Sequence, residues 1–190
     1  KETDKGYRRV VASPKPLNIV EYREIQKLIE LDFIVICCGG GGIPVVRKER
    51  KFGGVEAVID KDLASSVLAQ KIKADIFVIA SDVEGAAINW GKADQKILRK
   101  VPLAEMEKYV QDGQFAAGSM GPKVEAMIQF FKATGNRGVI CQLDDIEKAI
   151  AGSADYDDDL RQLVKEETSV DKIYEVLALN DISIAADRLR

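Results

Sequence analysis

The chain has 190 residues, of which 46% are hydrophobic and 31% charged, which is typical of one globular domain rather than of a disordered chain. The net charge of −3 gives no general basic surface for nucleic acid, and no apolar run is long enough to span a bilayer. Three cysteines are too few for a disulfide framework, and no signal-peptide pattern opens the chain, so we expect a protein of the reducing cytoplasm.

Histidine is absent from the sequence. This excludes a histidine general base, a Ser-His-Asp triad and a histidine-ligated metal. Chemistry must therefore depend on carboxylates, lysines, arginines, backbone amides or a hard cation held by oxygen atoms. Such groups suit phosphoryl transfer, which requires mainly positioning and stabilisation of charge.

Apolar periodicity predicts an α/β body, taken here in chain order. A helix is expected over 19–29, a buried strand over 33–38, a strand or a strand with its turn over 53–60, a helix over 62–74 and a buried strand over 75–81. Helices over 103–113 and 122–135, a strand over 137–143 and a short helix over 144–152 follow. This alternation predicts a mostly parallel sheet with helices on both faces, in which ligands bind at the carboxyl ends of the strands.

The composition changes after Gly152, which divides the chain into a body, 1–152, and a tail, 153–190. The tail opens with the acidic stretch "SADYDDD", and its apolar spacing then suggests small helices. We interpret the tail as a helical cap over exposed apolar surface, or alternatively as a docking element for another subunit.

Four consecutive glycines, Gly39, Gly40, Gly41 and Gly42, follow the first predicted strand. Glycine lets backbone amides approach an anion closely, so the run is a candidate phosphate cradle. A turn with no ligand explains it equally well, and the spacing matches neither a Walker loop nor a dinucleotide fingerprint.

Three further polar segments end or begin predicted elements. In "VIDKDLAS", Lys61 can offset phosphoryl charge and a neighbouring carboxylate can hold it, but a solvated helix start with Asp62 as N-cap is the more frequent explanation. In "GSMGPK", amides and Lys123 can meet a phosphate at a helix N-terminus, or form an ordinary loop. "SDVEGA" is a polar end to a buried strand and is equally consistent with a simple turn.

The two adjacent cysteines and the single tryptophan can each be explained by packing alone. Adjacent Cys37 and Cys38 are interpreted as small buried apolar residues rather than a redox pair. Trp90, the single tryptophan, can stack on a base or simply pack at the edge of the core.

The order of these segments is more specific than any one of them. "RRVVASPKP", "CGGGGIPVV", "GVEAVIDKDLAS", "ADIFVIASDVEGAAINWG" and "FAAGSMGPKVEAMIQFF" together resemble carbamate kinase, of the amino-acid kinase superfamily, from about Gly6 to about Gly152. The resemblance implies a three-layer αβα sandwich that acts as a homodimer. It also implies reversible phosphoryl transfer between carbamoyl phosphate and ADP, with Mg²⁺ accompanying the nucleotide, in the catabolism of arginine or related ureido compounds.

The resemblance also implies roles for single residues. Lys61 and Lys123 would stabilise the transferring phosphoryl group, and Asp62 would orient those lysines. The four glycines would line the phosphate site. The nucleotide would be bound near Ser81, Asp82, Met120 and Gly121. No dedicated protein cage for the metal is expected, because nucleotide phosphates hold most of it.

Nothing in the sequence matches the N-terminal half of that family, which carries part of the carbamoyl-phosphate site. We therefore expect a second chain that supplies this half, self-association that covers the exposed sheet edge, or a fragment of a longer enzyme. An alternative function is a non-catalytic nucleotide-binding or regulatory subunit. A third possibility is another superfamily member, acting on an acyl carboxylate such as that of acetylglutamate, or on a nucleoside monophosphate.

Overall fold

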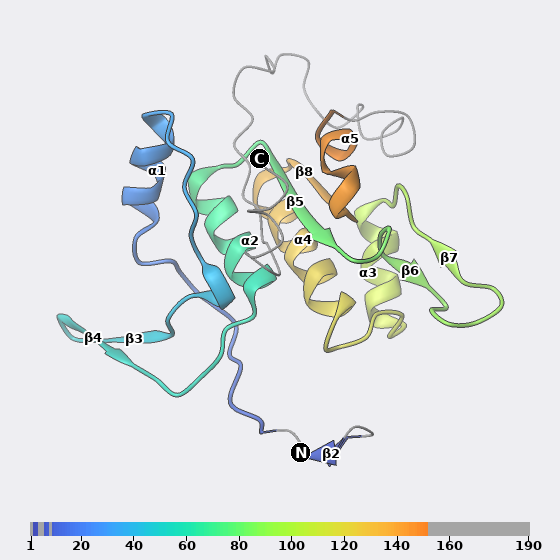
Figure 1. Cartoon of the computed structure of the whole chain (residues 1–190), viewed down its shortest axis with the longest axis horizontal. Helices are drawn as coiled ribbons and strands as arrows, with labels where there is room; N and C mark the ends of the chain where they lie inside the picture. The colour runs from blue at the N-terminus through green and yellow to red at the C-terminus, as the bar shows by residue number, and fades with distance from the viewer. Residues whose placement is uncertain (1, 4–5, 8, 152–190) are drawn as a thin grey trace.

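Two parallel strands, β5 (Ile76–Ser81) and β8 (Arg137–Gln142), form the centre of the computed structural model, which describes residues 2–3, 6–7 and 9–151 (Figure 1). Their register runs from Ile76 opposite Arg137 to Ser81 opposite Gln142. β5 is buried along its whole length, as its continuous apolar sequence predicts for a strand covered on both faces.

Side chains that alternate along β5 enter two different apolar clusters. Phe77 and Ile79 pack with residues of α2 (Lys61–Ile72) and α4 (Met120–Thr134). Ile76 and Val78 pack with residues of α5 (Ile146–Ala151) on the opposite face. The strands therefore lie between two helical layers, which confirms the predicted α/β class and its helix–sheet–helix layering.

α2 and α4 are packed against each other as well as against β5. The Ser66 hydroxyl, fully buried on α2, donates a hydrogen bond to the Ala126 carbonyl oxygen of α4 at 2.7 Å. The rings of Phe77 and Phe130 meet with centroids 5.4 Å apart at an angle of 51°, a geometry favoured by aromatic pairs. This packing fixes the first turns of both helices relative to the end of β5.

The other elements lie outside this core (Figure 1). They are α1 (Tyr22–Glu30), the 3₁₀ turn η1 (Gly39–Gly41), the hairpin of β3 (Val45–Lys48) and β4 (Lys51–Gly54), the hairpin of β6 (Ala87–Ile88) and β7 (Lys96–Ile97), α3 (Leu103–Gln111), the 3₁₀ turn η2 (Leu143–Asp145), and the pair β1 (Glu2–Thr3) and β2 (Gly6–Tyr7). All five predicted helices are therefore confirmed, with ends shifted by a few residues. The hairpin of β3 and β4 extends away from the core (Figure 1).

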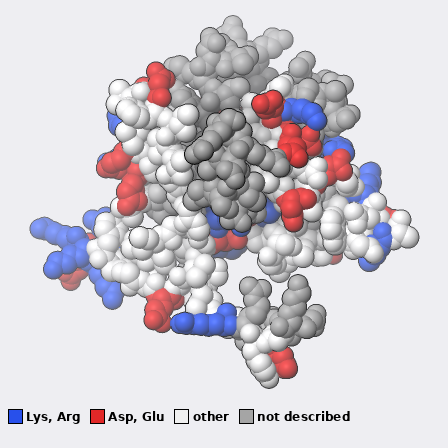
Figure 2. Space-filling model, viewed as in Figure 1, with Lys and Arg blue, Asp and Glu red and all other residues white. Residues whose placement is uncertain are grey.

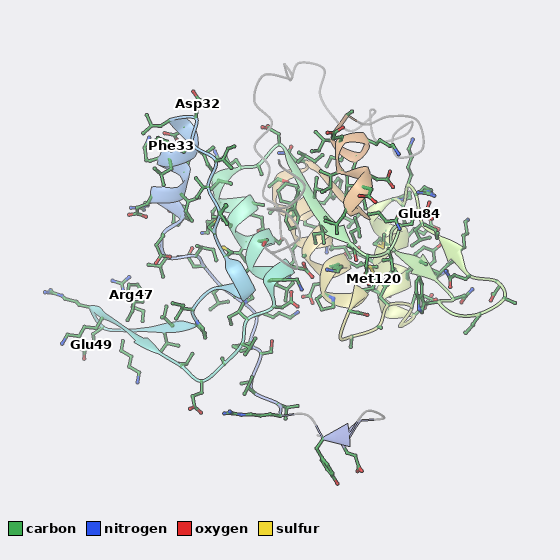
Figure 3. The ribbon with its side chains drawn as sticks, in the orientation of Figure 1. Asp32, Phe33, Arg47, Glu49, Glu84 and Met120 are labelled. Carbon is green, nitrogen blue, oxygen red and sulfur yellow. The ribbon has the colours of Figure 1, made fainter. Side chains whose placement is uncertain are left out.

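The predicted strand over 33–38 is wrong. This segment belongs to no strand, and Phe33, Ile34 and Ile36 are 60%, 97% and 85% exposed. Figure 3 shows Phe33 just beyond the C-terminal end of α1. A strand needs a neighbour for its backbone groups, and none of the described residues pairs with this segment.

The predicted strand over 53–60 is largely wrong as well. Only Gly53 and Gly54 lie in a strand, β4, and beyond them a single parallel bridge joins Ala57 to Ala12. β3 and β4 instead form an exposed antiparallel hairpin that the sequence analysis did not anticipate. Lys and Arg side chains gather on the hairpin, and Arg47 and Glu49 lie near its tip (Figures 2 and 3).

The tail, 153–190, lies outside the described residues, so its predicted helices are not tested. In the part of the chain that the structure describes, no helix has the length and apolarity needed to cross a membrane.

Candidate active site

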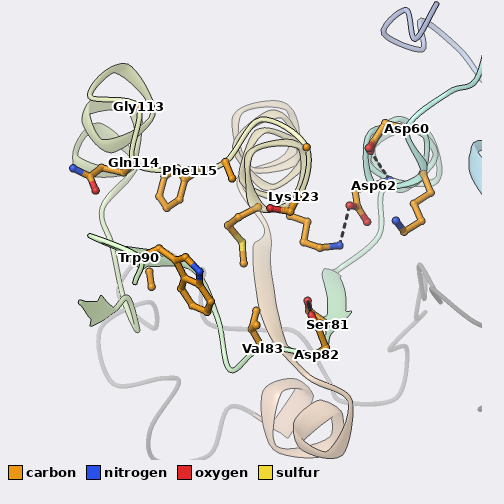
Figure 4. A pocket seen from close by; sticks show the side chains of 16 residues that line it. Asp60, Asp62, Ser81, Asp82, Val83, Trp90, Gly113, Gln114, Phe115 and Lys123 are labelled. Carbon is orange, nitrogen blue, oxygen red and sulfur yellow. Dashed lines mark hydrogen bonds and ion pairs between the residues drawn. The ribbon is translucent and has the colours of Figure 1, made fainter. Parts of the chain in front are cut away.

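A pocket of about 680 Å³ opens where the carboxyl end of β5 meets the first turns of α2 and α4 (Figure 4). This is the edge at which ligands bind in sheets of this type. The residues lining it are Asp60, Lys61, Asp62, Ser81, Asp82, Val83, Ala87, Trp90, Gly113, Gln114, Phe115, Ala116, Gly118, Ser119, Met120 and Lys123.

Lys123 and Asp62 form a buried ion pair in the wall of the pocket. Lys123 Nζ donates a hydrogen bond to Asp62 Oδ2 at 3.0 Å, and the two residues are 7% and 2% exposed (Figure 4). A buried charge requires such a partner, because desolvation of an isolated charge is costly. The carboxylate therefore fixes the ammonium group beside the pocket.

The other carboxylate oxygen of Asp62, Oδ1, is buried and has no hydrogen-bond partner among the described residues. Buried polar atoms are rarely left without one, so this atom is suited to a donor that arrives with a ligand or a rearranged side chain. Lys61, half-buried, precedes Asp62 in the chain and lines the same pocket.

Asp60, rather than Asp62, caps α2. Its Oδ1 accepts hydrogen bonds from the backbone N–H groups of Asp62 at 2.9 Å and Leu63 at 3.1 Å. The interpretation of Asp62 as a solvated N-cap is therefore wrong, because a side chain inside the first turn points away from the amides that a cap must reach. The capped turn places Lys61 and Asp62 at the pocket.

Two helix N-termini lie at the pocket, since Lys61 and Met120 are the first residues of α2 and α4. The Ser119 side chain makes no capping hydrogen bond with the start of α4. Unpaired amides and the helix dipole attract anions at such ends. With two lysines added, this part of the pocket is suited to phosphate groups.

The predicted nucleotide segments lie at this site. Ser81 and Asp82 line the pocket at the end of β5, where the Ser81 hydroxyl donates to Asp82 Oδ1 at 3.1 Å. Met120 also lines it. Gly121 does not, but its N–H donates to the Ala116 carbonyl oxygen at 2.9 Å and so shapes the loop that does.

The opposite wall contains residues that the sequence analysis did not single out, apart from Trp90. The Asn89 N–H donates to Gln114 Oε1 at 2.9 Å, which ties the hairpin that carries Trp90 to the loop before α4. Trp90 is 61% exposed, and Phe115 lies beside it in the pocket wall (Figure 4). No local sequence signal predicts the hydrogen bond between Asn89 and Gln114, because these two residues are 25 positions apart.

The glycine run lies outside the pocket wall, beside the start of α2. Gly41 is buried with φ +95°, and a Cβ atom there would stand 2.0 Å from the Ile59 carbonyl oxygen. Only glycine fits so close to another backbone in this conformation. Gly41 thus anchors the run against the residue before Asp60, while Gly39, Gly40 and Gly42 are exposed or open to space.

The fold is that of the amino acid kinase family. The profile of the amino acid kinase family matches residues 3–142, and the chain belongs to this family.

Carbamate kinases are among the relatives of this chain. The chain is 52% identical over 151 residues to the carbamate kinase of Thermococcus kodakarensis. This matched stretch covers 80% of this chain and 48% of that protein. It is 46% identical over 153 residues to the carbamate kinase of Trichomonas vaginalis, covering 80% and 49%. The chain therefore spans about half the length of the curated relatives it matches.

Solved structures of carbamate kinases are also similar to this chain over about half of their own length. A carbamate kinase from Giardia lamblia bound to AMP-PNP superposes with a TM-score of 0.76 at 47% identity, covering 80% of this chain and 48% of that one. The same enzyme bound to citric acid superposes with a TM-score of 0.72 at 47% identity, covering 78% and 46%.

Residues 2–3, 6–7 and 9–151 contain no group of three or more Cys, Asp or Glu side chains arranged to hold a metal ion. Of the carboxylates that line the pocket, Asp82 is exposed, whereas Asp62 is buried and paired with Lys123.

Proposed function

We propose that this chain forms the nucleotide-binding part of a carbamate kinase, which transfers a phosphoryl group reversibly between carbamoyl phosphate and ADP to give carbamate and ATP. The observation that carries the proposal is the buried Asp62–Lys123 pair at a pocket shared by two helix N-termini. The similarity to named carbamate kinases over 80% of the chain supports it.

The two lysines provide the charge that this chemistry requires. Negative charge is spread over the oxygens of the phosphoryl group during an in-line transfer, and fixed cations stabilise it. Lys123 is held by Asp62 Oδ2 and is therefore oriented before any ligand binds. Lys61 lines the same pocket. We propose that its ammonium group contacts the phosphoryl group and also donates a hydrogen bond to Asp62 Oδ1, the oxygen that has no partner among the described residues.

The remaining candidate residues bind and orient the substrates. The run Gly39 to Gly42, beside the start of α2, is proposed to approach the phosphate. The N–H groups of Gly41 and Gly42 already donate to the carbonyl oxygens of Cys38 and Gly39, so they shape this turn rather than bind the phosphate oxygens. The nucleotide phosphates lie near Asp82 and Met120. The base is placed against Trp90 and Phe115, whose rings provide an apolar wall.

Mg²⁺ fits this site as a companion of the nucleotide rather than as a protein-held ion. It keeps several waters and binds mainly through phosphates, so one exposed carboxylate such as Asp82 is enough on the protein side. When bound, it neutralises charge on the nucleotide phosphates. This role is compatible with a cytoplasmic enzyme of arginine or ureido-compound catabolism, which we propose as its setting.

A non-catalytic nucleotide-binding or regulatory subunit is the second candidate. The same pocket at two helix N-termini would also serve a chain that binds a nucleotide without turning it over. The similarity to carbamate kinases argues against the third possibility, a kinase of another acyl carboxylate or of a nucleoside monophosphate.

Exposed apolar side chains lie in the segment around the glycine run. Ile34, Ile36 and Ile43 are 97%, 85% and 88% exposed, which is unusual for neighbouring isoleucines. We propose that they contact a second copy of the chain, a separate chain that supplies the N-terminal half, or the corresponding half of a longer enzyme that includes this chain. Sedimentation velocity on the chain and on its Ile34→Lys variant tests self-association: a dimer that the variant loses supports it, and a monomer at all concentrations excludes it.

The proposed activity is tested by ATP formation from carbamoyl phosphate, ADP and Mg²⁺. The purified chain is compared with Lys61→Ala and Lys123→Ala, and calorimetry measures ADP binding in the same samples. Activity that both variants lose supports a working kinase. ADP binding without turnover supports the non-catalytic subunit. A folded chain that neither binds ADP nor forms ATP contradicts both candidates.

A further inference from the structure

The loop between β6 and β7 carries Trp90 to the pocket and is braced by its own hydrogen bonds. The Asn89 Nδ2 group donates to Asp94 Oδ2 at 2.8 Å, and the Gly91 N–H donates to Gln95 Oε1 at 2.8 Å. Asn89 and Gly91 adopt left-handed conformations, φ +54° and +75°, which asparagine and glycine tolerate better than most residues. These bonds give the loop one shape, but they do not set its position relative to the rest of the pocket.

The side chain of Gln114 links this loop to the helices. The Asn89 N–H lies beyond the last pair of the β6–β7 ladder, and it donates to Gln114 Oε1 at 2.9 Å. Because a backbone N–H can only donate, this bond also fixes which end of the Gln114 amide faces the loop. The Gln114 N–H donates in turn to the Tyr109 carbonyl oxygen of α3 at 3.0 Å. An ion pair between Glu107 and Lys132 then joins α3 to α4.

Trp90 depends on this link because its ring has little packing of its own. It is 61% exposed, and Phe115, the residue after Gln114, lies beside it in the pocket wall (Figure 4). A ring with so few neighbours takes its position from its backbone, and the N–H one residue earlier is the group that Gln114 holds. The same glutamine therefore sets the position of both aromatic residues of this wall.

We propose that Gln114 is a positioning residue for nucleotide binding, which holds Trp90 beside Phe115 so that the base meets a preformed wall. This inference rests on the proposed function for the identity of the ligand. Without the acceptor oxygen, the Asn89 N–H loses its partner and the loop moves, so the base must order the loop on binding, which lowers the affinity. The lysines of the phosphate end lie on α2 and α4, so the effect is confined to the base end of the pocket.

Two measurements on the free chain test the positioning of Trp90. Time-resolved anisotropy of tryptophan fluorescence reports on this ring alone, because the sequence has one tryptophan, and amide exchange measured by NMR reports on the Asn89 N–H. Gln114→Met keeps the length of the side chain but not its acceptor. It is expected to free the ring and to speed Asn89 exchange about fivefold, the factor that corresponds to one hydrogen bond of ordinary net strength.

Two further variants are the controls for this measurement. Gln114→Glu keeps an oxygen that can accept from the Asn89 N–H and is expected to behave like the wild type in both measurements. Gln111→Met makes the same change as Gln114→Met at a residue that is exposed at the end of α3 and does not line the pocket. It too is expected to leave the Trp90 ring and the Asn89 amide unchanged.

Calorimetry then compares the binding of ADP with that of pyrophosphate, each with Mg²⁺. Gln114→Met is expected to weaken ADP binding about tenfold, which is within the range that stacking on one aromatic ring contributes. Pyrophosphate has no base, so its affinity should not change. Adding Gln114→Met to Trp90→Ala should cause no further loss of ADP affinity, because the glutamine acts through that ring.

Unchanged anisotropy and unchanged Asn89 exchange in Gln114→Met would overturn the positioning role. ADP binding that stays as tight as in the wild type, an equal loss for pyrophosphate, or a further loss in the Trp90→Ala background would overturn the consequence for the nucleotide. A wild type that binds neither ligand counts against the proposed function. The anisotropy and exchange measurements need no ligand, so they still decide whether Gln114 positions Trp90.

Discussion

Lys123 Nζ donates a hydrogen bond to Asp62 Oδ2 at 3.0 Å across 61 positions of the sequence, and both side chains are buried. The pair joins the first turn of α4 to the first turn of α2, so it contributes both to the proposed chemistry and to the geometry of the core.

Lys123→Met is expected to destabilise the chain by about 3–5 kcal/mol, because the Asp62 carboxylate would remain buried without a partner. Asp62→Leu combined with Lys123→Met removes both charges and is expected to recover most of that loss. Urea unfolding followed by far-ultraviolet circular dichroism measures both variants. Since both lack a candidate catalytic group, neither should form ATP.

The double variant provides the control for this prediction. If the cost of Lys123→Met and that of Asp62→Leu simply add, the two side chains are not coupled and the buried pair does not stabilise the turn of either helix.

The helices and the two central strands could be predicted because their signals are local. β5 is a continuous apolar run, and α4 is followed directly by Gly135, whose φ of +73° is a conformation that glycine adopts most easily. The candidate residues at 61, 62 and 123 could be placed on one site by resemblance, and the geometry brings all three to one pocket.

The predictions that were wrong or missing concern features that depend on residues far away in the sequence. Residues 33–38 have the composition of a buried strand, but a strand forms only beside a partner that no local pattern specifies. Asp60 and Asp62 are two residues apart, and only the actual start of α2 decides which of them is the cap. The contact between Asn89 and Gln114 depends on how a hairpin packs against a loop.

Gly41→Ala is expected to lower the melting temperature and the affinity for ADP. Its φ of +95° disfavours a side chain, and the added Cβ would lie 2.0 Å from the Ile59 carbonyl oxygen, a backbone atom that moves only with the start of α2. Strain of this kind costs about 1–3 kcal/mol before the clash is counted. Thermal unfolding and calorimetry measure the two effects.

Gly39→Ala is the matched control, since this neighbour has no positive φ and nothing within 4 Å of an added Cβ. Its stability should stay within about 0.5 kcal/mol of wild type. Equal effects of the two substitutions would show that the run acts through flexibility rather than through the close approach at Gly41.

Asp60→Ala is expected to cost about 1 kcal/mol, because the amides of Asp62 and Leu63 would lose their acceptor. Asp60→Asn keeps an oxygen that can accept from the same amides and should retain most of the stability. Urea unfolding of the three proteins ranks them. A loss in Asp60→Asn as large as that in Asp60→Ala would indicate that the negative charge, rather than the cap, matters.

The stability of the chain is expected to fall between about pH 9 and pH 11 through Cys141. Burial raises the pKa of this thiol from 9.0 to about 11, and the nearby Asp145 adds to the shift. In this range the unfolded chain loses the thiol proton while the folded chain keeps it, so rising pH favours unfolding. Two pH units correspond to at most about 3 kcal/mol.

Other groups also titrate in this range, so the test is a comparison with Cys141→Ala, which removes a fully buried thiol. The variant is expected to be less stable near pH 7, because it leaves a small cavity, but its unfolding free energy should fall less steeply from pH 9 to pH 11. Parallel curves for the two proteins in urea would mean that Cys141 does not contribute to the alkaline loss of stability.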